Sequence, residues 1–299
     1  MSGRQFRHHE PRIPEDNVRR GGSLIVAIIM AVIGAISYYS SRSTNEVTGE
    51  VQHVSLTTDQ EVALGLQAFP EMAQQFGGEI DHPVVSNYVE EVGQRLVRSS
   101  DAQKGDYKYD FHVLADPETI NAFALPGGQV SITLGLLRRL RNESELAGVL
   151  GHEIGHVVGR HGAEQLSKQQ FAQTLVGAAT IAAYDPDRPG SSAQNAAIAA
   201  AIGQLVTMRF GRQDELEADA LGVQLMSQSG YDPRGMSELL QILAQSGEGG
   251  GRPPEFFSTH PNPENRLARV QEMIRTSGGS GGEMGEDRFQ QNVLRFLRQ

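Results

Sequence analysis

The first strongly patterned stretch of the chain is an uncharged, mostly apolar run near the N-terminus. It covers residues 21–41, between Arg20 and Arg42. A helix of that length spans about 30 Å, which matches the hydrocarbon thickness of a bilayer. Basic residues precede the run, so the positive-inside rule predicts a cytoplasmic N-terminus and an exported remainder. We expect a single-pass inner-membrane anchor. A signal peptide cleaved near Ala35-Ile36-Ser37, leaving a soluble periplasmic protein, is the alternative.

Apolar spacing after this run predicts a small sheet inside a mainly helical domain. Apolar and polar residues alternate over 109–114 and again over 129–133, which is typical of strands. Apolar residues at helical spacing, together with breakers and capping residues, predict helices in seven ranges: 84–98, 142–161, 165–183, 192–208, 213–227, 233–246 and 263–276.

Local capping signals predict several helix ends. Thr58, followed three residues later by Glu61, has the form of a capping box, and Pro70 is expected to kink or end the helix that begins there. Asn142 is predicted to cap the helix at 142–161, and Gly162 to end it.

These patterns divide the chain into five predicted segments. They are a basic cytoplasmic tail at 1–20, the transmembrane anchor at 21–41, a polar tether at 42–56, a single folded domain at 57–276, and a flexible Gly/Ser linker with a short, detached C-terminal helix at 277–299.

Composition narrows the chemistry that the folded domain can perform. Lys and Arg number 26 against 36 Asp and Glu, and this net charge of −10 argues against a nucleic-acid partner. The chain has no cysteine, which excludes disulfides, thiolate catalysis and cysteine-based zinc sites. A metal site in this protein must therefore be built from His, Asp and Glu.

The strongest chemical signal is His152-Glu153-Ile154-Gly155-His156, inside the predicted helix at 142–161. Residues four apart share one helix face, so His152 and His156 can bind one metal ion. Glu153 projects beside them, where it can take a proton from a water molecule. A pair of surface histidines is the alternative. The apolar residues around His152 and His156 disfavour a surface position, and two buried histidines without partners would be costly.

A catalytic zinc site needs a third protein ligand and one open position. A histidine at the metzincin spacing would fall at position 162, which is Gly, and His161 comes one residue too early. A carboxylate from another helix is the better candidate, because Glu215 and Asp219 lie four apart in an acidic segment. One of the two can bind the metal while the other accepts the free N–H of a ligand histidine.

Four segments occur in a characteristic order: NAFALPGG at 121–128, HEIGHVVGRH at 152–161, FGRQDELEAD at 210–219 and STHPNPENR at 258–266. Together they resemble the gluzincin family that contains CaaX prenyl proteases, HtpX and BepA. The resemblance covers roughly residues 57–275 and is greatest to the BepA-like periplasmic branch, without its repeat domain. It implies an α+β, mainly helical metallopeptidase domain at 57–276, with a small β-sheet whose edge strand borders the active-site cleft.

The resemblance also implies roles for the candidate residues. His152, His156 and Glu215 would bind one Zn²⁺ per chain, and Glu153 would be the general base. Asp219 would be an outer partner of the metal ligands.

Further roles follow from the same resemblance. Arg212 would support the active-site helices. Substrate backbone would pair with a segment on or beside an edge strand, a β-augmentation mode of recognition, formed by Asn121, Ala122, Phe123 and Ala124. The usual Ser before Arg212 is Gly211 here, a change that we expect to be tolerated.

His260 lies in a loop that resembles one in the BepA-like branch, with Arg266 following it. There the histidine can approach the metal, as a latency switch or as a transition-state stabiliser, so His260 is a candidate catalytic residue. An ordinary loop histidine before proline is the alternative. His161 is interpreted as structural, because its helix angle directs it away from the metal.

The sequence therefore predicts a membrane-anchored zinc endopeptidase whose catalytic domain lies in the periplasm. Its expected substrates are extended or misfolded envelope polypeptides, a role in protein quality control. One alternative is a latent or chaperone-like protein with zinc capped by His260, against which the intact Glu153 argues. Another is a metal-dependent hydrolase of non-peptide substrates, which the edge-strand segment at Asn121 disfavours.

Overall fold

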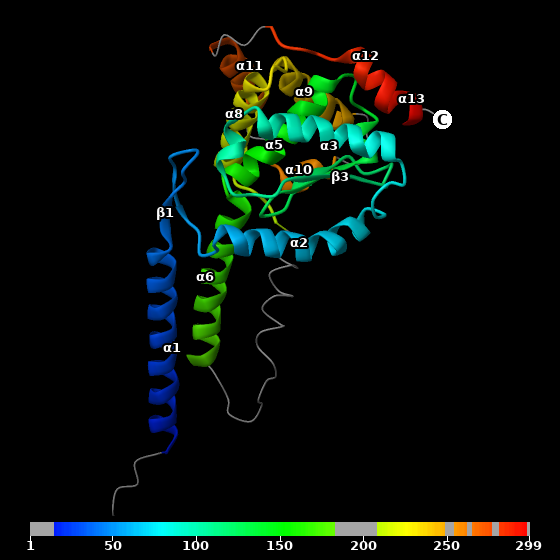
Figure 1. The fold of residues 1–299 in the computed structure, drawn as a ribbon. Helices are drawn as coiled ribbons and strands as arrows, with labels where there is room; N and C mark the ends of the chain where they lie inside the picture. Colours follow the sequence, from blue (N-terminus) through cyan, green and yellow to red (C-terminus); the bar gives the residue numbers. More distant parts are fainter. Residues whose placement is uncertain (1–14, 183–207, 249–253, 262–264, 277–280, 298–299) are drawn as a thin grey trace, which may run out of the picture.

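The computed structural model of the chain describes residues 15–182, 208–248, 254–261, 265–276 and 281–297. Helices α1 (Glu15–Ser40) and α6 (His161–Ala182) lie side by side and project from a rounded body that holds most of the other helices (Figure 1). The predicted mainly helical α+β class is confirmed. No helix within these described ranges combines the length and the apolarity that are needed to cross a bilayer.

The body consists mainly of helices. They are α2 (Thr58–Gln75), α3 (Pro83–Arg98), α4 (Leu134–Leu137), α5 (Glu143–Val158), α8 (Arg212–Gln228), α9 (Arg234–Glu248), α10 (Phe256–Thr259), α11 (Arg266–Thr276), α12 (Glu286–Phe289) and α13 (Arg295–Leu297), with a 3₁₀ turn at Asp101–Lys104 and a π turn at Gln290–Leu294. The predictions for 84–98, 213–227 and 233–246 are confirmed to within two residues at each end.

A small sheet lies on one side of α5. Its strands are β3 (Asp110–Leu114), β5 (Gln129–Thr133) and β4 (Ala122–Ala124), in the spatial order β3-β5-β4. The central strand β5 is parallel to β3 and antiparallel to β4, and Phe123 pairs with Ser131. Both predicted strands are confirmed. The short strand β4 occupies the edge of this sheet nearest the histidine motif, which is the placement that the edge-strand prediction requires.

Helix α5 is the centre of the body because it is buried on every side. All of its side chains are buried, and it packs against α3, α8 and α9 and against the sheet (Figure 1). Leu146, Leu150 and Ile154 are fully buried in the main core. Burial of each such side chain contributes about 1.5–3 kcal/mol. A helix fixed on all sides in this way holds its polar side chains in defined positions.

The ends of α2 differ from the predicted ones. Its N-cap is Thr57, which forms a capping box with Gln60, so the predicted pair Thr58 and Glu61 is wrong by one residue. The helix also continues through Pro70 to Gln75. Proline removes one backbone N–H from the helix, but Pro70 lies on the exposed face, where water can satisfy the carbonyl that loses its donor.

Helix α5 ends at Val158 and not at His161, and Gly162 lies inside α6. The break has a backbone cause, because Arg160 adopts a left-handed conformation with φ of 56°. Such a conformation is costly for a residue with a side chain and persists only when neighbours hold it. Arg160 donates from Nε to Glu61 over 2.9 Å and from Nη2 to the Leu56 carbonyl over 2.8 Å.

The chain on either side of the main domain is more ordered than the sequence predicts. The expected tether contains the hairpin β1 (Arg42–Thr44) and β2 (Val51–His53), and Asn45 donates to the Val158 carbonyl over 2.7 Å. The C-terminal helix is not detached, since Phe289 and Val293 are buried in the main core. The stretch 183–207, which includes most of the predicted helix at 192–208, lies outside the described residues, as do 249–253 and residues 277–280 of the predicted linker.

Candidate metal centre

Helices α5 and α8 approach each other closely at the histidine motif. A Cβ atom on Gly155 would lie 2.8 Å from the Ala218 carbonyl oxygen, and one on Gly222 would lie 3.1 Å from the His152 nitrogen. Larger side chains at these positions would separate the two helices. Because the helices touch through small residues, α8 brings Glu215 directly over the two histidines of α5. Ala218 belongs to this contact, whereas Ala220 is exposed.

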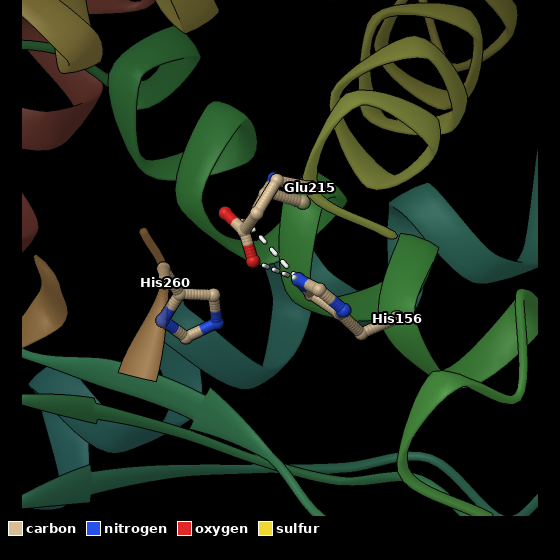
Figure 2. Close-up of side chains that lie close together, drawn as sticks. His156, Glu215 and His260 are labelled. Carbon is tan, nitrogen blue, oxygen red and sulfur yellow. Dashed lines mark hydrogen bonds and ion pairs between the residues drawn. The ribbon is translucent and has the colours of Figure 1, made fainter. Parts of the chain in front are cut away.

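Four side chains from three helices or their ends meet in one buried group: His152, His156, Glu215 and His260. One ligand atom from each lies within 4.8 Å of the others, and every one of these side chains is buried. Figure 2 shows the rings of His156 and His260 and the Glu215 carboxylate pointing toward a common centre, with the sheet passing beneath them. The structure thus brings together the three predicted metal ligands and the predicted loop histidine.

The spacing among His152, His156 and Glu215 fits a tetrahedral metal ion. The two Nε2 atoms of His152 and His156 are 3.1 Å apart, and the Glu215 oxygens lie 3.6 Å and 3.4 Å from them, respectively. Ligands about 2.0–2.1 Å from a tetrahedral zinc are about 3.3 Å from each other. Glu215 Oε1 and His260 Nε2 are buried without a hydrogen-bond partner, while Glu215 Oε2 is ion-paired with Arg266. Such unpaired buried atoms are costly unless an ion takes their lone pairs.

Burial also sets the protonation of these groups. Burial lowers the pKa of His152, His156 and His260, so all three imidazoles are neutral at physiological pH. Neutral imidazole is the form that binds metals. Burial raises the pKa of Glu215 well above its ordinary value, opposed by the charge of Arg266. A bound cation would favour the ionised form of Glu215 further.

Glu153 lies at the edge of this group, with Oε1 at 3.6 Å from His260 Nε2. Burial raises the pKa of Glu153 to about 8, against the opposing charge of Arg266. Both of its oxygens are buried without a hydrogen-bond partner. The carboxyl is therefore placed and tuned to exchange a proton near neutral pH, as a general base or acid must.

Asp219 and Arg266 form a buried charged layer behind the ligand residues. Asp219 Oδ1 is 2.9 Å from His152 Nδ1, as predicted for an outer partner. Arg266 donates from Nε and Nη2 to Asp219 over 2.6 Å and 2.8 Å, and its Nη1 is 3.0 Å from Glu215. Although burial opposes ionisation, the charge of Arg266 lowers the pKa of Asp219.

The arginine that supports the metal group is Arg266 and not the predicted Arg212. Arg212, predicted to support the active-site helices, is exposed at the first position of α8, and Arg266 of α11 occupies the supporting place instead. The sequence around Arg266 does not indicate that its side chain contacts Asp219 and Glu215. Its role becomes visible only where α11 packs against α8.

His161 is closer to the site than its helix angle suggested. Because the chain turns at Arg160, the buried ring of His161 folds back, and its Nδ1 lies 2.9 Å from His156 Nδ1. Its Nε2 is 3.4 Å from Glu217 on α8. The prediction of a structural residue that points away from the metal group is therefore wrong in direction, since His161 contacts the ring of a candidate ligand.

The predicted substrate segment lies beside the same group. Ala122, Phe123 and Ala124 form β4, and Asn121 precedes it with its Oδ1 buried and unpartnered. On one side β4 pairs with β5, and no second strand of the described residues pairs with it. An edge strand of this kind offers backbone N–H and C=O groups to another extended chain.

Comparison with known proteins agrees with this geometry. The buried HExxH pair, the carboxylate from a second helix and the adjoining edge strand define a metallopeptidase type of site. Residues 83–274 match the family described as Peptidase family M48. The chain belongs to this family, and the resemblance noted in the sequence is confirmed.

The matched relatives include proteases from bacteria and from a eukaryotic organelle. The chain is 32% identical over 254 residues to the beta-barrel assembly-enhancing protease of Escherichia coli (strain K12), covering 82% of this chain and 51% of that protein. It is 30% identical over 244 residues to the mitochondrial metalloendopeptidase OMA1 of Schizosaccharomyces pombe, covering 81% of this chain and 69% of that protein. The chain thus spans about half the length of the bacterial relative.

Proposed function

We propose that this protein is a zinc-dependent endopeptidase. The observation that carries the proposal is the buried group of His152, His156 and Glu215 with Glu153 beside it, in a chain that belongs to a peptidase family. The alternative reading as surface histidines does not suit a pair that is 1–2% exposed. The alternative of a hydrolase for non-peptide substrates is disfavoured because the edge strand β4 next to the group suits a peptide backbone.

His152, His156 and Glu215 would hold the zinc ion. Each histidine would bind through Nε2, which leaves its Nδ1–H free to donate. The Nδ1–H of His152 would donate to Asp219, and that of His156 to His161, whose own Nε2–H then faces Glu217. Partners of this kind fix the ring orientation and the tautomer of a ligand histidine.

Glu153 would act as the general base and then as the general acid. When bound, zinc supplies a Lewis acid that polarises the scissile carbonyl and lowers the pKa of a water molecule. A carboxylate oxygen of Glu153 takes a proton from the attacking water and delivers it to the leaving amine nitrogen. Burial raises the pKa of Glu153 to about 8 in the metal-free protein. A bound zinc ion would favour the ionised carboxylate, which is the form that accepts the proton.

The substrates that suit this site are extended or misfolded polypeptides. The outer edge of β4 would pair with substrate backbone, which recognises extended chain more than a particular sequence. The Escherichia coli relative is named for enhancing beta-barrel assembly, and envelope proteins under quality control are accordingly the substrate class that we propose.

We also propose that helix α1 anchors the protein in a bacterial inner membrane, with the catalytic domain in the periplasm. Support comes from the uncharged run at 21–41 and the Arg residues before it. Large apolar side chains on α1 are also exposed from Leu24 to Ile36. Carbonate extraction of membranes from cells expressing the full chain tests this, since an anchored protein stays in the membrane pellet. A soluble product lacking residues 1–37 would support signal cleavage instead.

A second candidate function rests on His260. Its ring joins the metal group, so four protein side chains would be available to the ion, whereas a catalytic zinc site keeps one position open. The protein would then be latent, or chaperone-like, until the loop that carries His260 moves. In the active enzyme the same ring could stabilise charge on the substrate carbonyl oxygen.

One experiment tests both candidates. The purified full chain in detergent, loaded with zinc, is incubated with an unfolded protein, and fragments are followed by mass spectrometry. We expect cleavage by the wild type and by the Glu91→Gln control, whose residue is exposed on α3, but none by Glu153→Gln. If His260→Ala alone cleaves, the latent state is correct. Equal cleavage by wild type and Glu153→Gln would refute the mechanism.

A further inference from the structure

A cavity of about 110 Å³ lies between helix α2, strand β4 and the segment that carries His260. Its walls are mostly apolar. The apolar lining residues are Met72, Phe76, Phe123, Leu125, Met208 and Phe210. Gln75 also lines it and is exposed, so the cavity reaches the surface beside this residue. His260 is the lining residue that the cavity shares with the metal group.

The cavity shares a wall with the metal group. The ring of Phe210 stacks on His156 with centroids 4.0 Å apart, and it lies 5.4 Å from the ring of His260. His260 itself lines the cavity (its ring is labelled in Figure 2). An occupant of this cavity would therefore contact the same rings that surround the candidate zinc position.

The opposite wall is formed by β4. Phe123 and Ala124 of this strand line the cavity, and so does Asn121, whose buried Oδ1 has no hydrogen-bond partner. A peptide paired with the free edge of β4 alternates its side chains between the two faces of the sheet. One side chain of such a peptide would enter the cavity while the neighbouring backbone lies against the metal group.

We propose that this cavity is the specificity pocket of the protein and that it takes one aliphatic side chain, of the size of Leu or Met, next to the cleaved bond. This inference rests on the proposed peptidase function and deepens it. An apolar cavity of about 150 Å³ accommodates benzene, so one of about 110 Å³ suits an aliphatic side chain better than a large aromatic one. Glu255 and Thr259 also line the cavity, and the carboxylate of Glu255 disfavours an acidic side chain there.

Met72 is the residue that sets the size of the pocket. It is buried on α2, away from the metal ligands, and forms part of the cavity wall. Replacing Met72 by Ala would enlarge the pocket without changing β4 or the zinc ligands. Leu64 is a matched control, since it lies on the same helix and packs on the same apolar cluster but does not line the cavity.

The test uses the full zinc-loaded chain in detergent and quenched peptides that differ only at one central residue, which is Leu, Met, Phe, Ala or Asp. Values of kcat/KM are measured for wild type, Met72→Ala and Leu64→Ala, and mass spectrometry locates the cleaved bond. Binding of the same peptides to zinc-loaded Glu153→Gln, with and without Met72→Ala, is measured separately by fluorescence anisotropy. The binding measurement does not depend on catalysis.

We expect the kcat/KM of the wild type to be at least 10-fold higher for Leu and Met peptides than for Ala and Asp peptides. Met72→Ala should raise the ratio of kcat/KM for Phe to that for Leu by roughly 10-fold or more, because small volume changes in apolar pockets alter selectivity by about 10–200-fold. Leu64→Ala should keep the wild-type ratio. Cleavage without preference would overturn the pocket and leave the peptidase function intact. Selective binding that follows Met72, without cleavage by either the wild type or His260→Ala, would support the pocket and refute the peptidase function. Absence of both binding and cleavage would overturn both proposals.

Discussion

Arg266 offers the sharpest test of how the metal centre is held together. Its guanidinium is 2% exposed and bridges Asp219 and Glu215, both of which are fully buried. Replacing it by Met retains an unbranched apolar side chain but leaves the two carboxylates without their shared cation. Removal of one partner from a buried ion pair costs about 3–5 kcal/mol, because the remaining charge stays buried and unpaired.

We therefore expect Arg266→Met to lower the free energy of unfolding of the metal-free protein by about 3–5 kcal/mol. For a domain of this size that corresponds to a fall in melting temperature of roughly 6–20 °C. Zinc should reduce the loss, because a bound cation replaces part of the missing charge beside Glu215. Chemical denaturation of the full chain in detergent, with chelator and with zinc, measures both values.

Two further variants make this prediction specific. Arg269→Met is the matched control, since Arg269 lies on the same helix but is exposed, and it should change stability by less than about 0.5 kcal/mol. Adding Asp219→Asn to Arg266→Met removes one of the unpaired charges, so the double variant should lose less stability than the sum of the single variants. A loss for Arg266→Met that equals the Arg269→Met value would refute the reasoning.

Further predictions concern the metal and the helices that hold it. Chelation should lower the melting temperature, because zinc at 100 times its dissociation constant stabilises the fold by about 2.7 kcal/mol, and a metal-independent melting curve would contradict the site. His161→Phe removes the partner of His156 Nδ1 and should weaken zinc binding by about 10–100-fold in a competition titration, whereas an unchanged affinity would make His161 structural only. Gly155→Val should separate α5 from α8 and weaken both zinc affinity and stability, because even a Cβ atom there lies 2.8 Å from the Ala218 carbonyl oxygen.

Much of the fold could be predicted from local patterns. The strands at 109–114 and 129–133 and the helices at 84–98 and 213–227 follow from periodicity and capping, which depend on near neighbours. Errors arose where a distant contact overrides the local signal. The left-handed turn at Arg160 is held by Glu61, a residue 99 positions away, so the end of α5 could not be predicted from its own sequence.

The candidate site divides in the same way. The sequence by itself determined that His152 and His156 share a face, because four residues complete about one turn of a helix, and that Glu153 accompanies them. It also pointed to Glu215 and His260 through their resemblance to family motifs.

Tertiary structure alone decided the distances between these groups. The contact of α5 with α8 through Gly155 and Ala218 places Glu215 over the histidines, and the packing of α11 brings in Arg266. The cavity at Met72 likewise exists only where α2 meets β4. The physical reason is that periodicity fixes the direction of a side chain on its own helix, whereas the separation between helices depends on which side chains pack between them.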